Sequence, residues 1–279
     1  MESSTVVKQV ALAHGRLVYA EAGTGPPVLL LHQTPRSWDE YRDVLPRLAA
    51  GGYRAIAFDT PGFGASAQLP GEPTIERWAQ AAHAGLDALE IVSATVVGHH
   101  TGGVIAVELA AQRPERVTAL VLSSTPLTDE AYRAQAPDES GVDAAEDAEG
   151  LRRSRADFYP ADRPDLLDRY VADALKAGPL ARIGHRVVGA YAMEGTIGRL
   201  DMPALLIGAS EDRFAYPQLA RMRAALPHAE VAEIEGGMVP LPDGWPEPFA
   251  AALLGFLGRR VPRAERRGPG SPSGDDGGR

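Results

Sequence analysis

The stretch that decides the fold is VVGHHTGG, residues 96–103. It joins an apolar run typical of a strand to a very apolar helical segment, Thr101–Gln112. Gly98 and Gly102 have the spacing of a tight turn, because residues without a Cβ let the backbone pass close to its neighbours. Such a turn lifts its middle residue, His100, above the end of the strand. It also leaves the backbone N–H of Thr101 at a helix start, where it can meet an anion.

Buried strands and helices alternate on both sides of this turn. Short apolar runs between turn residues are typical of strands buried in a parallel sheet. The alternation predicts an α/β fold, with a mostly parallel central sheet and helices on both faces. The predicted strands are a hairpin of Thr5–Leu12 and Arg16–Glu21, followed by Pro27–Leu31, Tyr53–Phe58, Ala94–Val97, Val117–Leu122, Ala204–Gly208 and Val231–Ile234. The predicted helices are Ser37–Ala50, Thr74–Leu89, Thr101–Gln112, Tyr216–Leu226 and Glu247–Leu257.

The alternation breaks between residues 126 and 195, a charged segment of helical pattern that lacks strand signals. A helical segment inserted between two halves of one sheet predicts a lid over the carboxyl ends of the strands. We therefore expect a core made of residues 1–125 and 196–260, with a helical lid at 126–195. Residues 261–279 are rich in Arg, Gly, Pro and Ser and are expected to form a disordered tail.

Composition excludes several classes of function. The net charge of −9 leaves no basic stripe that could displace phosphate counterions, so nucleic acid is not an expected partner. The absence of cysteine excludes disulfides and thiolate chemistry. Met1–Val10 lacks the pattern of a signal peptide, and no apolar run approaches the roughly 20 residues that span a bilayer. We expect a cytoplasmic protein that acts on a small molecule, without a membrane partner and with homodimer formation left open.

Further segments follow the order found in a known family. Leu29–Trp38 has the pattern of an oxyanion loop, and Phe58–Ser66 that of the loop after the following strand. Leu205–Gly208 with Asp212 is similar to the strand and acid of a catalytic triad, and Pro246–Ala250 to the start of the last helix. Together with the turn at 96–103, these segments resemble the α/β-hydrolase fold family, in particular its epoxide hydrolases, esterases and C–C hydrolases. The resemblance implies this fold over residues 5–260, whereas the fold hosts many reactions.

The sequence departs from the family pattern at three positions. His100 stands where a hydrolase of this kind has serine, aspartate or cysteine. The resemblance places the catalytic histidine near Met238 or Val239, and no histidine is there. Gln33 stands where a glycine commonly follows the histidine of the oxyanion loop. Only the acid position, Asp212, is unchanged, so the serine–histidine–aspartate triad is absent.

The remaining residues predict an acid–base pair. An imidazole on the turn reaches further than a serine hydroxyl, so His100 could point toward Asp212. The carboxylate would then fix the imidazole tautomer and raise its basicity, and the other ring nitrogen would face the substrate as general base. The backbone N–H of Thr101, with the side chain or backbone of Gln33, would stabilise an enolate or oxyanion.

Two neighbouring histidines have simpler interpretations. His32 ends the adjacent strand; it is a candidate substrate-binding residue, with a hydrogen bond inside its own loop or a contact with His100 as alternatives. His99 should point away from His100 into packing. A metal site built from His32, His100 and Asp212 lacks the spacing of known metal motifs, so neither a metal nor another cofactor is expected.

The function favoured by these residues is cofactor-independent acid–base chemistry on a small carbonyl-containing compound. Hydrolysis of an ester, a lactone or a C–C bond is one form, with His100 as general base supported by Asp212. A lyase, dehydratase or cyclase reaction is an alternative that needs no nucleophile. A ligand-binding protein that has lost catalysis is the other alternative. A hydrogen bond from His100 to Asp212, with the imidazole open to a pocket, would favour an enzyme.

Overall fold

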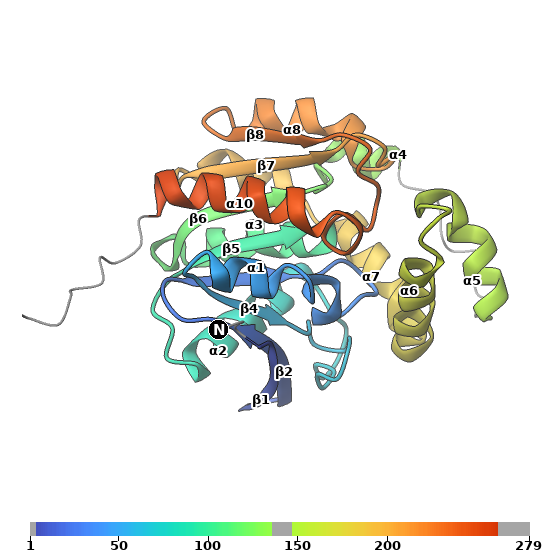
Figure 1. The fold of residues 1–279 in the computed structure, drawn as a ribbon, viewed down its shortest axis with the longest axis horizontal. Helices are drawn as coiled ribbons and strands as arrows, with labels where there is room; N and C mark the ends of the chain where they lie inside the picture. Colours follow the sequence, from blue (N-terminus) through green and yellow to red (C-terminus); the bar gives the residue numbers. More distant parts are fainter. Residues whose placement is uncertain (1–3, 136–146, 262–279) are drawn as a thin grey trace, which may run out of the picture.

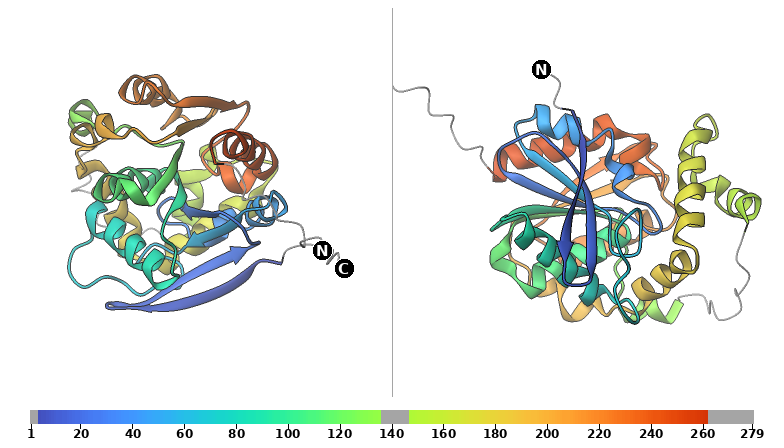
Figure 2. Two further views of the ribbon diagram at one scale, coloured as in Figure 1. Left: turned by 90° about the vertical axis from the view of Figure 1, so that its left-hand side faces the viewer. Right: turned by 90° about the horizontal axis from the view of Figure 1, so that it is seen from below.

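An eight-stranded sheet forms the centre of the computed structural model, which describes residues 4–135 and 147–261. The order of its strands is β1-β2-β4-β3-β5-β6-β7-β8. The pairs β1/β2 and β2/β4 are antiparallel and the others are parallel, which confirms the predicted mostly parallel sheet. The strands are β1 Val6–Leu12, β2 Gly15–Ala22, β3 Pro27–Leu31, β4 Arg54–Phe58, β5 Ala94–His99, β6 Val117–Ser123, β7 Ala204–Ala209 and β8 Glu230–Ile234. Figure 2 shows the β1–β2 hairpin at one edge, twisting away from the sheet.

Helices cover both faces of the sheet (Figure 1). In the core they are α1 Leu45–Ala50, α2 Ile75–Ala88, α3 Thr101–Gln112, α8 Leu219–Ala225, α9 Leu241–Gly244 and α10 Pro246–Arg260. Helices α1 and α10 pack on one face, and α2, α3 and α8 pack on the other. Along β3, Leu29 and Leu31 join the second of these layers, whereas Val28 and Leu30 join the first. Because side chains alternate along a strand, each strand is held by apolar contacts from both sides.

The segment after β3 is less helical than its apolar spacing predicts. The predicted helix Ser37–Ala50 is wrong in its first half, where a 3-10 turn at Trp38–Tyr41 precedes α1. Two causes are visible. Asp59 accepts a hydrogen bond from the backbone N–H of Trp38 at 2.7 Å, which holds the chain in a turn. Pro46 lacks an N–H and fits only the first turn of a helix, so α1 begins just before it.

Between β6 and β7 the chain leaves the sheet, with no strand among residues 126–135 and 147–195. It forms α4 Glu130–Gln135, α5 Ala148–Arg155, α6 Pro164–Ala177 and α7 Pro179–Ala190, here called the inserted helices. Figure 1 shows α6 and α7 beyond the carboxyl ends of the parallel strands, and α7 contacts α3, α4 and α6. That these helices act as a lid stays a prediction. The predicted tail, residues 261–279, lies outside the described residues apart from Val261.

Candidate active site

His100 occupies the turn between β5 and α3 and has a left-handed backbone, with φ 46° and ψ −113°. Its backbone N–H donates to the carbonyl of Ser123 at 3.0 Å, which fixes the turn on the neighbouring strand. A Cβ on Gly98 would lie 2.2 Å from the carbonyl oxygen of Gly102, and one on Gly102 would lie 1.9 Å from that of Leu31. Both positions therefore require glycine. A non-glycine residue in such a conformation costs about 1–3 kcal/mol of stability, so the surrounding contacts must offset the backbone strain at His100.

The imidazole of His100 is hydrogen-bonded to a buried carboxylate. Its Nε2 lies 2.7 Å from Oδ2 of Asp212, while Oδ1 of Asp212 accepts the backbone N–H groups of Phe214 and Ala215 at 3.0 Å each. Burial alone would raise the pKa of Asp212, but the charge and hydrogen bond of His100 and the backbone donors lower it to about 2. An ionised Asp212 accepts the proton of Nε2. The lone pair of the neutral ring is then on Nδ1.

His99 lies beneath this pair. It is fully buried; its Nε2–H donates to the carbonyl of Val239 at 2.8 Å, and its Nδ1 accepts from the hydroxyl of Ser123 at 3.0 Å. Burial lowers the pKa of His99 to about 3, so it is neutral. It does pack in the core, but it does not point away from His100, because the two rings meet edge to face with centroids 4.7 Å apart. His99 thus supports one side of the His100 ring.

A cavity of about 780 Å³ opens above His100. On the side of the core, His100, Thr101 and Val239 are among the residues that line it. Val239, and not Met238, lines it at the position where the family pattern expected a histidine. The inserted helices and the loops beside them form the other walls, through Tyr132, Arg155, Phe158, Tyr159, Tyr170, His185, Arg186, Val188, Gly189 and Ala190. His100 is therefore joined to Asp212 on one side and open to a pocket on the other.

The predicted oxyanion donors differ in what they can offer. Gln33 lines the cavity, but its backbone N–H and its side-chain amide both donate to the buried carboxyl of Glu40, at 2.9 and 2.6 Å. Burial raises the pKa of Glu40 to about 8, although the nearby charge of Arg36 opposes this. The backbone N–H of Thr34 makes only a long bond of 3.3 Å, to the hydroxyl of Thr101. The N–H of Thr101 belongs to the first turn of α3. The backbone N–H groups of Thr34 and Thr101, both from residues that line the cavity, are therefore the candidate donors.

The structure does not place His32 in the lining of the cavity, which corrects its prediction as a substrate-binding residue. Its Nε2 accepts the backbone N–H of Thr60 at 2.9 Å, and its Nδ1–H donates to the carbonyl of Gln33 at 2.8 Å. Burial lowers the pKa of His32 to about 4. Because both ring nitrogens are hydrogen-bonded, the side chain links two loops. This agrees with the alternative in which His32 forms a hydrogen bond inside its own loop, and not with substrate binding.

Sequence reasoning missed His185, which lines the cavity from α7. Burial lowers its pKa to about 4, and the charges of Arg155 and His100 act in the same direction. His185 therefore lies within the electrostatic reach of both side chains and is neutral at ordinary pH. Its position on an amphipathic helix carried no signal that could distinguish a cavity residue from a packing residue.

Arg36 ties the inserted helices to the core and was also missed. Its fully buried guanidinium pairs with Asp173 of α6 and with Asp243 of α9. Burial disfavours its charge, but these carboxylates outweigh that effect and raise its pKa. Arg169 adds a bond to Asp243 at 3.1 Å. These ion pairs hold α6, which contributes Tyr170 to the lining of the cavity, against the core.

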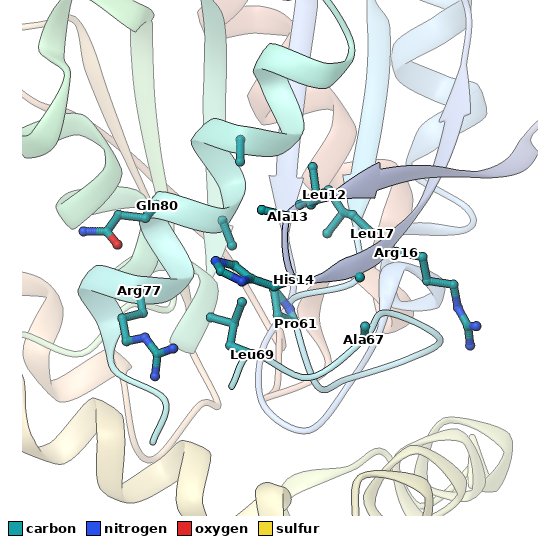
Figure 3. Close-up of a pocket in the computed structure, with 13 residues that line it drawn as sticks. Leu12, Ala13, His14, Arg16, Leu17, Pro61, Ala67, Leu69, Arg77 and Gln80 are labelled. Carbon is teal, nitrogen blue, oxygen red and sulfur yellow. The ribbon is translucent and has the colours of Figure 1, made fainter. Parts of the chain in front are cut away.

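A second, smaller hollow of about 130 Å³ lies at the β1–β2 turn and shares no residue with the cavity (Figure 3). His14, Leu69 and Arg77 line it. The guanidinium of Arg77 donates to the backbone carbonyls of Pro70 and Glu72, so it serves the adjacent loop. The hollow holds no acid–base pair among the described residues, which leaves the cavity above His100 as the candidate active site.

Among the described residues, no group of three or more histidine, aspartate and glutamate side chains is placed to hold a metal ion. Across residues 4–135 and 147–261, no helix has both the length and the apolar character needed to span a membrane.

Comparison with known proteins bears on this geometry. A family model described as the alpha/beta hydrolase fold matches residues 26–177, more than half of the chain. The chain belongs to this family. The match includes Gln33, His100 and Thr101 and ends before Asp212. The predicted family is confirmed, and the unusual residue on the turn therefore belongs to an α/β hydrolase.

Individual relatives of this α/β hydrolase match part of its length. Bifunctional epoxide hydrolase 2 of Sus scrofa is 36% identical over 126 residues, which are 42% of this chain and 23% of that protein. The 2-hydroxymuconate semialdehyde hydrolase of Pseudomonas sp. (strain CF600) is 38% identical over 125 residues, 43% of this chain and 44% of that protein. The chain thus spans less than half the length of these relatives. The solved structure of an epoxide hydrolase from an endophytic Streptomyces is 25% identical, with a TM-score of 0.73, and the match covers 91% of this chain and 95% of that one.

Proposed function

We propose that this protein is a cofactor-independent enzyme that uses His100 as a general base on a small carbonyl-containing compound. The observation that carries the proposal is the 2.7 Å bond from His100 Nε2 to Asp212, made by an imidazole that also lines a cavity of about 780 Å³. A pocket that only binds ligand does not need a buried carboxylate held by two backbone N–H groups beneath its histidine. That arrangement favours an enzyme over a binding protein.

In the proposed reaction Nδ1 of His100 takes a proton. For hydrolysis the proton comes from a water molecule, whose oxygen attacks the carbonyl carbon of an ester or lactone. The imidazolium then returns the proton to the leaving oxygen as the tetrahedral intermediate collapses. Asp212 stabilises the imidazolium throughout, since its carboxylate stays ionised with a pKa of about 2. General base catalysis of this kind contributes roughly 10²–10⁴-fold to the rate.

Negative charge on the carbonyl oxygen would be stabilised from the core side. The backbone N–H groups of Thr34 and Thr101 are the candidate donors, and substrate would displace the long 3.3 Å bond between these residues. Charge that develops against fixed backbone donors in a partly dry site is stabilised without reorganisation. Neutral His185, which also lines the cavity, is a further candidate N–H donor.

The class of bond broken is the finer part of the proposal. The relatives named above are hydrolases of an epoxide and of a semialdehyde, which supports hydrolysis. The same base could instead remove a proton next to a carbonyl, as in a lyase, dehydratase or cyclase reaction. The presence of His185 in the lining of the cavity favours this second candidate, because a neutral imidazole can donate a hydrogen bond to an enolate.

Substrate screening tests the proposal. The purified protein is assayed against p-nitrophenyl esters, lactones, epoxides and β-diketones, and against a metabolite extract followed by mass spectrometry. His100→Ala should lose nearly all turnover of any substrate found, whereas His14→Ala, which changes an exposed imidazole, should retain it. Full activity in His100→Ala would exclude the proposed base.

A further inference from the structure

The cavity above His100 is lined by cations in a chain that is otherwise acidic. The chain carries 37 acidic and 28 basic side chains. Among the described residues that line the cavity, three are arginines, Arg155, Arg186 and Arg221, and none is an aspartate or glutamate. Asp212 is no exception, since its carboxylate is fully buried beneath His100. The charged side chains that line the cavity are therefore basic, in contrast to the net acidic charge of the chain as a whole.

The three arginines differ in what they already bind. Arg221 pairs with Asp129 and also contacts Gln218, so its charge is compensated. Arg155 is half-buried and lies over the ring of Tyr170 at cation–π distance, with its guanidinium carbon 5.5 Å from the ring centroid. Arg186 is exposed. Neither Arg155 nor Arg186 makes an ion pair with a carboxylate of residues 4–135 or 147–261.

Arg155 is suited to bind a planar anion. A guanidinium that lies near an aromatic ring at cation–π distance and makes no ion pair keeps N–H groups available, and these match a carboxylate with two parallel hydrogen bonds. The guanidinium of Arg155 and the imidazole of His100 belong to residues that line the same cavity, as does His185. The walls beside them are apolar, with the rings of Phe158 and Phe214 in contact at 4.5 Å between centroids.

We propose that the cavity takes a small organic carboxylate, whose anionic end binds Arg155 while its carbonyl group lies against His100. The second contact rests on the proposed function, whereas the first does not. Arg186, at the surface of the same cavity, would attract the anion during entry and contribute little once it is bound. Arg221 would stay with Asp129.

Binding of unreactive probes tests the anion site without reference to turnover. The probes are phenylacetate, 3-phenylpropionate, 4-phenylbutyrate and 5-phenylvalerate, each compared with its own primary amide by calorimetric titration. The acid and amide have nearly the same shape, so their difference reports charge. At least one acid should bind wild-type protein about tenfold or more tighter than its amide, as expected for charge-assisted hydrogen bonds. If no acid binds better than its amide, the proposal is overturned on the wild-type protein alone.

Variants then locate the site. Arg155→Met should remove the preference for the acid and leave amide binding unchanged, and Arg155→Lys should retain part of it. The matched control is Arg152→Met, an exposed arginine of the same helix that does not line the cavity. Arg186→Met should slow acid binding at low salt only. An acid preference that survives in Arg155→Met would overturn the assignment.

The experiments distinguish failure of the proposed general base, His100, from failure of the proposed anion site at Arg155. His100→Ala should keep the acid preference, because the anion binds at Arg155. If His100→Ala retains turnover but the preference for acids is present, the general base is wrong and the anion site stands. If turnover depends on His100 but the preference is absent, the anion site is wrong. A preference lost in His100→Ala and kept in Arg155→Met would place the anion on the imidazole and overturn this inference.

Discussion

Replacing Asp212 by asparagine should reverse the tautomer of His100. Oδ1 of Asp212 accepts two backbone N–H groups at 3.0 Å, from Phe214 and Ala215, and only an oxygen can do so. The carbonyl oxygen of the asparagine must therefore keep that position, which turns its NH₂ group toward Nε2 of His100. Nε2 can accept this bond only when it carries no proton, so the proton of the neutral ring moves to Nδ1. Nδ1, the proposed base, then has no lone pair that can accept a proton.

The expected effect on kcat/KM is a loss of roughly 10²–10⁴-fold, the contribution of a positioned general base. This corresponds to about 3–5 kcal/mol of transition-state stabilisation. Binding of an unreactive ligand should be unchanged, since the amide and the carboxylate have the same shape. Nitrogen-15 NMR on labelled histidine measures the tautomer directly, and Asp201→Asn, an exposed position before β7, is the control. Near-wild-type kcat/KM in Asp212→Asn, or a protonated Nε2 in that variant, would refute the reasoning.

Further outcomes follow from the same structure. If His100 is a base and not a nucleophile, activity should rise with pH through one ionisation, and mass spectrometry of quenched turnover should find no adduct on its peptide; a kinetically competent adduct would contradict this. Fluorophosphonate should not label the protein, because the only serine of the described residues whose hydroxyl is hydrogen-bonded to an imidazole, Ser123, is fully buried with His99; stoichiometric labelling with loss of function would reveal another nucleophile. Arg36→Met should lower the free energy of unfolding at pH 7 by about 3–5 kcal/mol in denaturant titrations, as for a broken buried ion pair, whereas Arg42→Met, which breaks an exposed pair, should cost about 1 kcal/mol or less. The loss should be smaller in acid. Burial raises the pKa of Asp243 in the folded state and the charge of Arg36 opposes this, so without Arg36 the carboxyl takes up a proton as the pH falls and the folded state no longer contains an unpaired buried charge. A loss independent of pH would argue against the buried carboxylates as its cause.

Much of the fold could be predicted because it depends on local pattern. The strand β3 is an apolar run between turn residues, and the turn at His100 is marked by two glycines that the backbone needs. The error at Ser37–Ala50 has a different origin. Its apolar spacing is helical, but Asp59, distant in sequence, binds the N–H of Trp38 and holds a turn there. A tertiary hydrogen bond of this kind leaves no trace in the local pattern.

The candidate site also combines features that the sequence could predict with features that depend on tertiary packing. The pairing of His100 with Asp212 could be anticipated because the fold brings the ends of β5 and β7 to one edge of the sheet. The side chain of His185 could not, since its place depends on how α7 packs over that edge. Glu40 was equally hidden, because nothing near it in sequence indicates that a buried carboxyl would engage both amides of Gln33.

The left-handed backbone of His100 also bears on how this protein can evolve. The fold imposes φ 46° on the residue at this turn whatever its side chain, and glycine alone adopts that angle without strain. A histidine at this position is therefore less favourable for stability than a glycine would be. A lineage that abandoned the chemistry would be free to drift toward glycine at this position. Among descendants of this chain, the residue at 100 would then separate those that keep the proposed chemistry from those that only bind ligand.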